Sequence, residues 1–224
     1  MKKYITFVFF IIVVVSASFF FIQRHIKKEK VLERIINNLK ADSRIAEVLV
    51  VVVEYDEPTG ERLTTIKFLE YNSEGEPLEP KYFTFSGNTI QFQSLVVRFD
   101  EDYAGMGDEL RGKSVYLFWK VFMLDGKDTE EFTITEIGSI PRGYKVKDLK
   151  SDFERKLWEN FWEYALNKRK ADTLGIKSAQ IEAPGSVFIP GILYTLKIEH
   201  DGGIFIESSP LPDILKGENI YIPG

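Results

Sequence analysis

The chain contains no cysteine among its 224 residues. This absence excludes disulfide bonds, thiol nucleophiles and thiolate metal ligands together. A chain without cysteine fits a reducing and an oxidising compartment equally well. Cysteine usage therefore does not decide where the protein works.

Histidine is nearly as scarce, with two copies. His25 follows the apolar run at the N-terminus, where we expect it to contact lipid headgroups. His200 ends a predicted strand face, where a partly buried structural role is favoured over that of a lone general base. No second histidine is available to join His200 in a metal site, and no nucleophile-elbow sequence marks a Ser-His-Asp arrangement. We therefore predict no catalytic residue, no cofactor and no metal ligand.

Long uncharged runs are also rare, and the one that stands out is at the N-terminus. Residues 4–22 are 19 consecutive residues without a charge, and as a helix they would be about 28 Å long, close to the hydrocarbon thickness of a bilayer. Basic residues flank the run, with Lys2 and Lys3 before it and Arg24 after it. The sequence therefore predicts a transmembrane signal-anchor helix over residues 1–23.

A cleaved signal peptide is the alternative interpretation of the same segment. The basic start, the apolar core and the small residues Ser16 and Ala17 are typical of a segment that a signal peptidase accepts. Cleavage there would leave Phe19, Phe20 and Phe21 at the new terminus of a soluble protein. An uncleaved anchor explains these aromatic residues better.

Residues 24–41 are predicted to form a basic juxtamembrane helix. Between Arg24 and Lys40 there are six basic and two acidic residues, and an apolar stripe recurs at helical spacing. The stripe consists of Leu32, Ile35, Ile36 and Leu39. It is expected either to pack back onto the domain or to pair with another helix in a short coiled coil.

The remaining residues, 41–224, carry a net charge of −11, which follows from the overall −5 once the basic N-terminal residues are subtracted. An acidic domain repels phosphate, so we expect no nucleic-acid partner. Positive charge beside the apolar run favours a cytoplasmic domain if counted literally. Long domains translocate regardless of such counts, however, and a short basic start is typical of export signals. We therefore place the domain on the extracytoplasmic (periplasmic or extracellular) side.

Residues 42–224 are predicted to form one soluble, strand-dominated α+β domain of mostly antiparallel strands. The β-branched run over residues 48–53 indicates a strand buried on both faces. Further strands are expected in an antiparallel meander, separated by turn sequences rich in Gly, Asn, Asp and Ser. They cover residues 63–71, 82–85, 90–99, 115–124 and 131–137, followed by two hairpin-like units at residues 179–189 and 193–206.

One clear amphipathic helix interrupts the strands. Ser151 and Glu154 match a capping box, and Lys168-Arg169-Lys170 would complement the negative end of the helix dipole. The apolar stripe of this helix is predicted to consist of Phe153, Leu157, Phe161 and Tyr164.

Two sequence motifs suggest ligands but fail in context. Gly107, Gly112, Lys113 and Ser114 match G-x-x-x-x-G-K-[ST], the phosphate-binding loop. A strand and not a helix is predicted to follow Ser114, so we expect an ordinary connecting loop and no nucleotide. Asp100 and Asp102 begin like a calcium loop, but Ala104 and Arg111 occupy two ligand positions. A solvated acidic loop is the ordinary explanation.

Carboxylates and aromatics leave two hypotheses about function. Glu159 and Glu163 lie one helical turn apart beside Trp158 and Trp162, a combination that could face a sugar, although a solvated helix edge beside packed aromatics is commoner. Aromatic residues make up 14% of the chain, and some of them could form a docking surface. The sequence favours a membrane-anchored, noncatalytic interaction or structural domain of a cell-envelope assembly, which could contact a protein partner or form a homo-oligomer through the stalk or an aromatic surface. A tethered enzyme or ligand-binding domain acting through carboxylates is the alternative.

Overall fold

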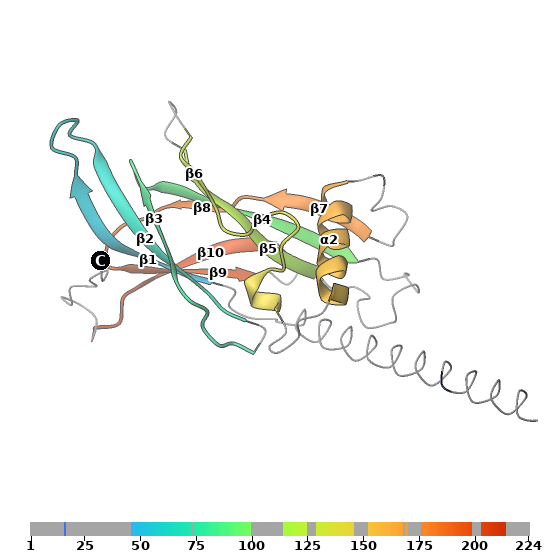
Figure 1. The fold of residues 1–224 in the computed structure, drawn as a ribbon. Coiled ribbons are helices and arrows are strands. Elements are labelled where there is room, and N and C mark those ends of the chain that lie inside the picture. The colour runs from blue at the N-terminus through green and yellow to red at the C-terminus, as the bar shows by residue number, and fades with distance from the viewer. Residues whose placement is uncertain are drawn as a thin grey trace, which may run out of the picture.

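Ten strands in two antiparallel sheets, with one α-helix and one 3₁₀ turn, make up the described part of the computed structural model (Figure 1). The residues described are 16, 46–72, 74–99, 114–124, 129–145, 152–167, 169, 176–198 and 203–213. Strands dominate, as the sequence predicted. The predicted membrane anchor, apart from Ser16, and the whole of the predicted stalk lie outside the described residues.

The first sheet has the strand order β10-β9-β1-β2-β3. A meander of three consecutive strands forms one side of it, and a hairpin from the C-terminal part of the chain adds the other side to β1. The bounds are β1 Ala46–Tyr55, β2 Arg62–Glu70, β3 Lys81–Phe85, β9 Ile192–Ile198 and β10 Ile204–Pro210.

The second sheet has the order β6-β5-β4-β7, with β8 also paired to β4. Strands β7 and β8 follow one another along the same side of β4, which brings residues distant in sequence into one sheet. The bounds are β4 Thr89–Phe99, β5 Ser114–Met123, β6 Glu131–Thr133, β7 Ile176–Glu182 and β8 Gly185–Val187.

The two sheets pack face to face around one apolar core. Alternate residues of each strand point inward, as the period of two of a β-strand requires. Phe68 of the first sheet lies 5.5 Å from Phe92 and 5.2 Å from Phe118 of the second sheet, measured between ring centroids. These contacts join the sheets as a β-sandwich.

A β-bulge in each of the long strands β1 and β5 keeps the apolar side chains facing the core. In β1, Val50 pairs with Ile66 and Val52 with Thr65, so Val51 is the extra residue. In β5, Trp119 is the extra residue, because the register shifts between the pairs on either side of it. Each bulge moves the following side chains by one position, so that apolar residues continue to face the core. Tyr116 and Phe118 point inward before Trp119, and Val121 and Met123 do so after it.

The helix α2, Asp152–Leu166, lies on the outer side of the second sheet, next to β7. In Figure 1 it stands at the end of the molecule opposite the β1–β2 turn. Beneath it, Leu95 and Leu117 are buried although they face away from the main core. The 3₁₀ turn η2, Arg142–Tyr144, precedes the helix, and Tyr144 stacks on Trp158 with ring centroids 5.6 Å apart.

Several details differ from the sequence prediction. Strand β1 is buried on its inner face only, because no described helix covers its outer face, where Leu49 and Val51 are half-buried. Strand β6 ends at Thr133, because the next two backbone N–H groups turn to donate to the carbonyl of Trp119. The expected hairpin at residues 179–189 is wrong, since β7 and β8 both pair with β4 and not with each other.

The described buried side chains of the helix are Trp158, Trp162 and Ala165. Of the predicted stripe, Phe161 is half-buried, and the side chains of Phe153, Leu157 and Tyr164 lie outside those described. The larger indole rings occupy the space against the sheet, and Phe161 packs on the edge of Trp158. Both residues of the predicted capping box, Ser151 and the side chain of Glu154, lie outside the described residues.

Candidate functional site

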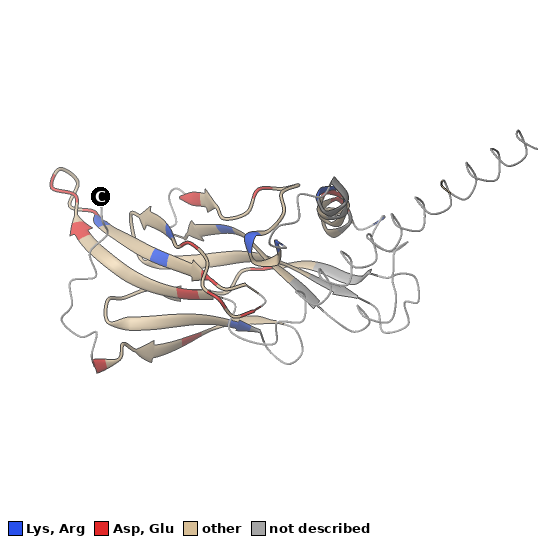
Figure 2. Cartoon of the chain, turned by 60° about the horizontal axis from the view of Figure 1, so that its bottom comes forward, with Lys and Arg blue, Asp and Glu red and all other residues tan. Residues whose placement is uncertain are grey.

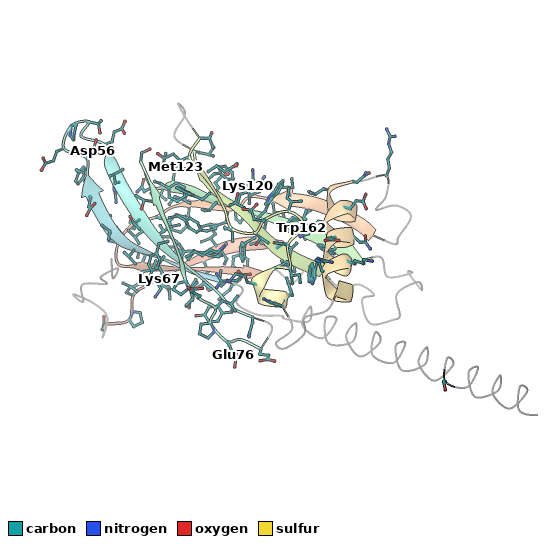
Figure 3. All side chains as sticks on the ribbon, viewed as in Figure 1. Asp56, Lys67, Glu76, Lys120, Met123 and Trp162 are labelled. Carbon is teal, nitrogen blue, oxygen red and sulfur yellow. The ribbon has the colours of Figure 1, made fainter. Side chains whose placement is uncertain are left out.

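The acidic and aromatic residues of α2 do not form a sugar-binding surface. Trp158 and Trp162 are 2% and 1% exposed, whereas Glu159 and Glu163 are exposed on the other side of the helix. The indole N–H of Trp162 donates a 2.8 Å hydrogen bond to the carbonyl of Ser139, so this ring points into the molecule (Figure 3). Rings buried in this way have no free face for a sugar to stack on. The commoner interpretation, a solvated edge beside packed aromatics, is the observed arrangement.

Most of the other residues singled out in the sequence lie outside the described residues. They are Gly107, Gly112, Lys113, Asp100, Asp102, His25 and His200. Ser114 begins β5, so a strand follows the phosphate-loop motif, as predicted. Within the residues that the structure describes, no group of three or more His, Cys, Asp or Glu side chains is placed to hold a metal ion.

Sequence reasoning missed a charged cluster at one end of the sandwich. Glu70 at the end of β2 and Lys81 at the start of β3 share the inward face with the core residues of their strands, and η2 closes over them. Lys81 donates a hydrogen bond to the carbonyl of Ile134, and Arg142 forms a 3.0 Å ion pair with the exposed Glu79. Both cations are therefore engaged with the protein itself.

Position 143 leaves no room for a side chain beside this cluster, and glycine has none. A Cβ atom built on Gly143 would lie 3.1 Å from Glu70 Oε1 and 3.3 Å from the carbonyl oxygen of Tyr71. The turn η2 therefore lies directly against the carboxyl group. Glycine is the residue that permits such a close approach of backbone to side chain.

Burial in this cluster shifts three pKa values. Desolvation raises the pKa of Glu70 to about 7, against the opposing effects of Lys81 and Arg142. Desolvation lowers the pKa of Lys81, with Arg142 acting in the same direction. Burial also raises the pKa of Tyr144, whose hydroxyl oxygen accepts a 3.3 Å hydrogen bond from the backbone N–H of Tyr116. In each case burial removes the group from water and so disfavours its charged form.

The outer face of the first sheet is a second feature of interest. Its central strands carry the leucines Leu49 and Leu69, and Leu193 of β9 lies directly across from Leu49. All three are half-buried, and neither α2 nor η2 covers them. Figure 2, in which the bottom of Figure 1 comes forward, shows charged positions thinly spread along these strands. We call this surface, defined by Glu47, Leu49, Lys67, Leu69 and Leu193, the leucine face.

At each edge of the first sheet, one backbone N–H donates to a carboxylate that lies outside that sheet. Glu182 of β7 accepts a 2.8 Å hydrogen bond from the backbone N–H of Ile204, the first residue of edge strand β10. At the opposite edge, Glu130 accepts one of 2.8 Å from the N–H of Ser86, just after β3. Pro210 ends β10 without an N–H. Each carboxylate satisfies an N–H that would otherwise be open at an edge, and a proline lacks one altogether.

The aromatic residues lie mainly in the core, and a few reach the surface. Tyr55, Tyr82 and Phe132 are 68%, 40% and 37% exposed, but they lie apart on three strands. Phe132 packs edge-on against Phe85, with ring centroids 5.1 Å apart. The exposed aromatic residues therefore do not gather into one cluster among the described residues.

The fold and these surfaces define an all-antiparallel β-sandwich in which no described helix covers the half-buried leucines on the outer face of the first sheet. Comparison of the chain with models of protein families, with curated proteins and with solved structures found no match in any of the three.

Proposed function

We propose that this chain is a membrane-anchored, noncatalytic interaction domain of a cell-envelope assembly, and that it binds a protein partner through the leucine face. The observation that carries the proposal is the group of half-buried leucines that adjoin one another on the outer face of the first sheet, where no described helix covers them. An apolar surface patch is typical of a site of contact with another protein. The carboxylates bound at the two edges favour contact through the face over the addition of a strand.

The proposed anchor rests on the sequence. The uncharged run of residues 4–22 supports a single membrane helix, and the basic residues 24–41 support a juxtamembrane helix beside anionic headgroups. No helix within the described residues is long and apolar enough to cross a bilayer. We place residues 42–224 on the extracytoplasmic side. The chain should remain in the membrane fraction after a carbonate wash, and a mature terminus near Ser18 would instead favour a cleaved signal peptide.

The binding proposal is tested by photo-crosslinking in native membranes. Benzoylphenylalanine introduced at position 49 of the full chain should give one discrete adduct, while the same group at position 59, in the exposed β1–β2 turn, should give none. Leu193→Lys should remove the adduct at position 49, because a charge in the apolar centre opposes burial. Mass spectrometry then identifies the protein in the adduct. No adduct from position 49, or one unaffected by Leu193→Lys, would contradict a partner on this face.

A second candidate function is favoured by one observation, the pKa of Glu70. A carboxyl group that titrates near 7 has the value expected of a general acid or base, and it supports the alternative of a tethered enzyme that acts through carboxylates. Against this role, η2 lies directly on the carboxyl group at Gly143. An enzyme of this kind would lose its activity in Glu70→Gln while the adduct at position 49 remained.

A further inference from the structure

We propose that the partner on the leucine face is a second copy of this chain, bound through the same face about a two-fold axis. This inference rests on the proposed function and names its partner. It follows from the register of the two central strands of the first sheet and from the charges that this register places side by side.

Four residues of the leucine face form a square with alternating chemistry. Glu47 of β1 pairs across the sheet with Leu69 of β2, and Leu49 pairs with Lys67 in the same way. All four lie on the outer face, because residues two apart on a strand share a face and their neighbours Val48 and Phe68 are buried in the core. The two leucines thus occupy one diagonal of the square, and the two opposite charges occupy the other.

This square is complementary to itself. A two-fold axis lying in the face along the leucine diagonal places Leu49 against Leu49 of the other copy and Leu69 against Leu69. The same rotation places Glu47 of each copy over Lys67 of the other. A two-fold interface requires a surface of this kind, in which one patch matches itself. The apolar diagonal is buried, and both charge contacts between the copies are attractive.

The state of the two charged residues fits this arrangement. Lys67 forms no ion pair with any described residue of its own chain, and it lies on the side of the first sheet away from the second sheet (Figure 3). Glu47 accepts a 2.5 Å hydrogen bond from the hydroxyl of Tyr71, which holds the carboxylate in place at the edge of the leucines. By contrast, Lys197 on the flank of the face already pairs with Glu207 of its own chain. A second copy would therefore offer Lys67 an opposite charge that the described residues of its own chain do not pair with it.

The apolar composition of β1 agrees with a face that is covered in the assembled protein. A strand with consecutive apolar residues is typical of burial on both sides, yet the outer side of β1 is only half-buried in the part of the chain that the structure describes. A second copy would cover Leu49 and Leu193. A shared membrane anchor would also confine the two copies to one plane and raise their effective concentration.

The test is a charge exchange in the full chain, purified in detergent and studied by sedimentation equilibrium. The natural chain should dimerise, and Glu47→Lys and Lys67→Glu should each weaken the dimer by about tenfold or more, because each places like charges opposite one another twice. An equimolar mixture of these two variants should form a heterodimer, since both cross-contacts are then attractive. Lys156→Glu on the exposed side of α2 makes the same charge change away from the face and should dimerise like the natural chain.

The outcomes separate this inference from the proposed function. A natural chain that is monomeric, a dimer that is unaffected by Lys67→Glu, or a mixture that fails to recover the dimer would each overturn the second copy as the partner. An adduct of position 49 with a different protein would keep the proposed function and overturn this inference. Glu47→Lys also removes the Tyr71 hydrogen bond, so Lys67→Glu and the recovery in the mixture are the decisive measurements, with the melting temperature of each variant as the check on folding.

Discussion

The carboxylate of Glu182 accepts a hydrogen bond of 2.8 Å from the backbone N–H of Ile204 and so joins the edge of the second sheet to the first residue of β10. The bond satisfies an N–H that would otherwise face outward from an edge strand. It also fixes the start of β10 relative to β7, two strands that belong to different sheets. The sandwich is therefore held together along this edge by a polar contact as well as by its core.

Loss of this cap should weaken the edge. Glu182→Ala should lower the free energy of unfolding by about 1 to 3 kcal/mol, the usual range for a hydrogen bond to a charged acceptor. Amide hydrogen exchange of Ile204 should become faster, whereas exchange of core amides in β1 should follow only the global loss. The exposed Glu207 gives a control, because Glu207→Ala removes a surface ion pair and should cost less. An equal effect of both substitutions would contradict the role given to Glu182.

Two neighbouring threonines on β2 should respond in opposite directions to the same change. The hydroxyl of Thr64 is buried without a hydrogen-bond partner, whereas that of Thr65 lies 2.8 Å from the hydroxyl of Thr84 on the outer face. Thr64→Val removes an unsatisfied polar group at nearly constant shape, so it should raise the free energy of unfolding by about 1 kcal/mol. Thr65→Val should lower it by about 0.5 to 1 kcal/mol. Denaturant unfolding of both variants measures the difference, and a destabilised Thr64→Val would show that this hydroxyl has a partner.

Glu70 should make stability depend on pH near neutrality. Its pKa is about 7 in the folded protein, against 4.5 for an unperturbed carboxyl group, so the folded state binds the proton more tightly than the unfolded state. The contribution of Glu70 to the free energy of unfolding is therefore largest below about pH 4.5. It falls as the pH rises towards about 7 and then levels off. Glu70→Gln should remove this fall in a series of melting temperatures.

The charged groups around Glu70 determine which variant serves as the control in the pH series. Lys81 and Arg142 lower the pKa of Glu70, and Glu136 raises the pKa of Lys81. Tyr144 is the last residue of η2, the turn that lies against Glu70. Glu79→Gln changes a carboxylate that pairs with Arg142 but is 82% exposed. This variant should keep the pH dependence of the natural chain. Parallel curves for Glu70→Gln and the natural chain would contradict a titration of Glu70 in this range.

A methyl group at position 143 should disturb the same cluster. Gly143→Ala brings a Cβ atom to 3.1 Å from Glu70 Oε1 and 3.3 Å from the backbone oxygen of Tyr71. A backbone atom cannot move aside easily, so the free energy of unfolding should fall by about 1 to 3 kcal/mol. Because Tyr144 stacks on Trp158, the tryptophan fluorescence of the folded protein should change as well. An unchanged melting temperature together with an unchanged spectrum would show that η2 does not lie so close.

The sequence predicted the strand-rich, antiparallel character of the domain because alternating apolar residues and turn residues are local signals. It predicted β2 to within one residue at each end, but it did not predict the change of sheet at Gly87, since a turn between sheets and a turn within one sheet have the same composition. The bulge at Trp119 also has no local signal, because the apolar residues around it read as one continuous strand.

The charged cluster and the leucine face were hidden from sequence reasoning for a different reason. Glu70, Lys81 and Arg142 are distant along the chain, and their proximity depends on how η2 closes the sandwich. The leucine face depends on the register between β1 and β2, which a single sequence does not specify to one residue. The one usable signal was the uninterrupted apolar run of β1, which predicted a second buried face without identifying what covers it.

The central claim is that the leucine face is covered by a partner in the membrane, and the natural absence of cysteine makes a direct measurement straightforward. Single cysteines replace Leu49 on this face and Thr59 in the exposed β1–β2 turn. Their reaction rates with a maleimide reagent are compared in native membranes that have been made permeable to the reagent. The same rates are then measured after solubilisation at high dilution. The account predicts that the cysteine at position 49 is protected in membranes and becomes reactive on dilution, whereas that at position 59 reacts equally in both. Equal reactivity at position 49 before and after dilution would contradict it.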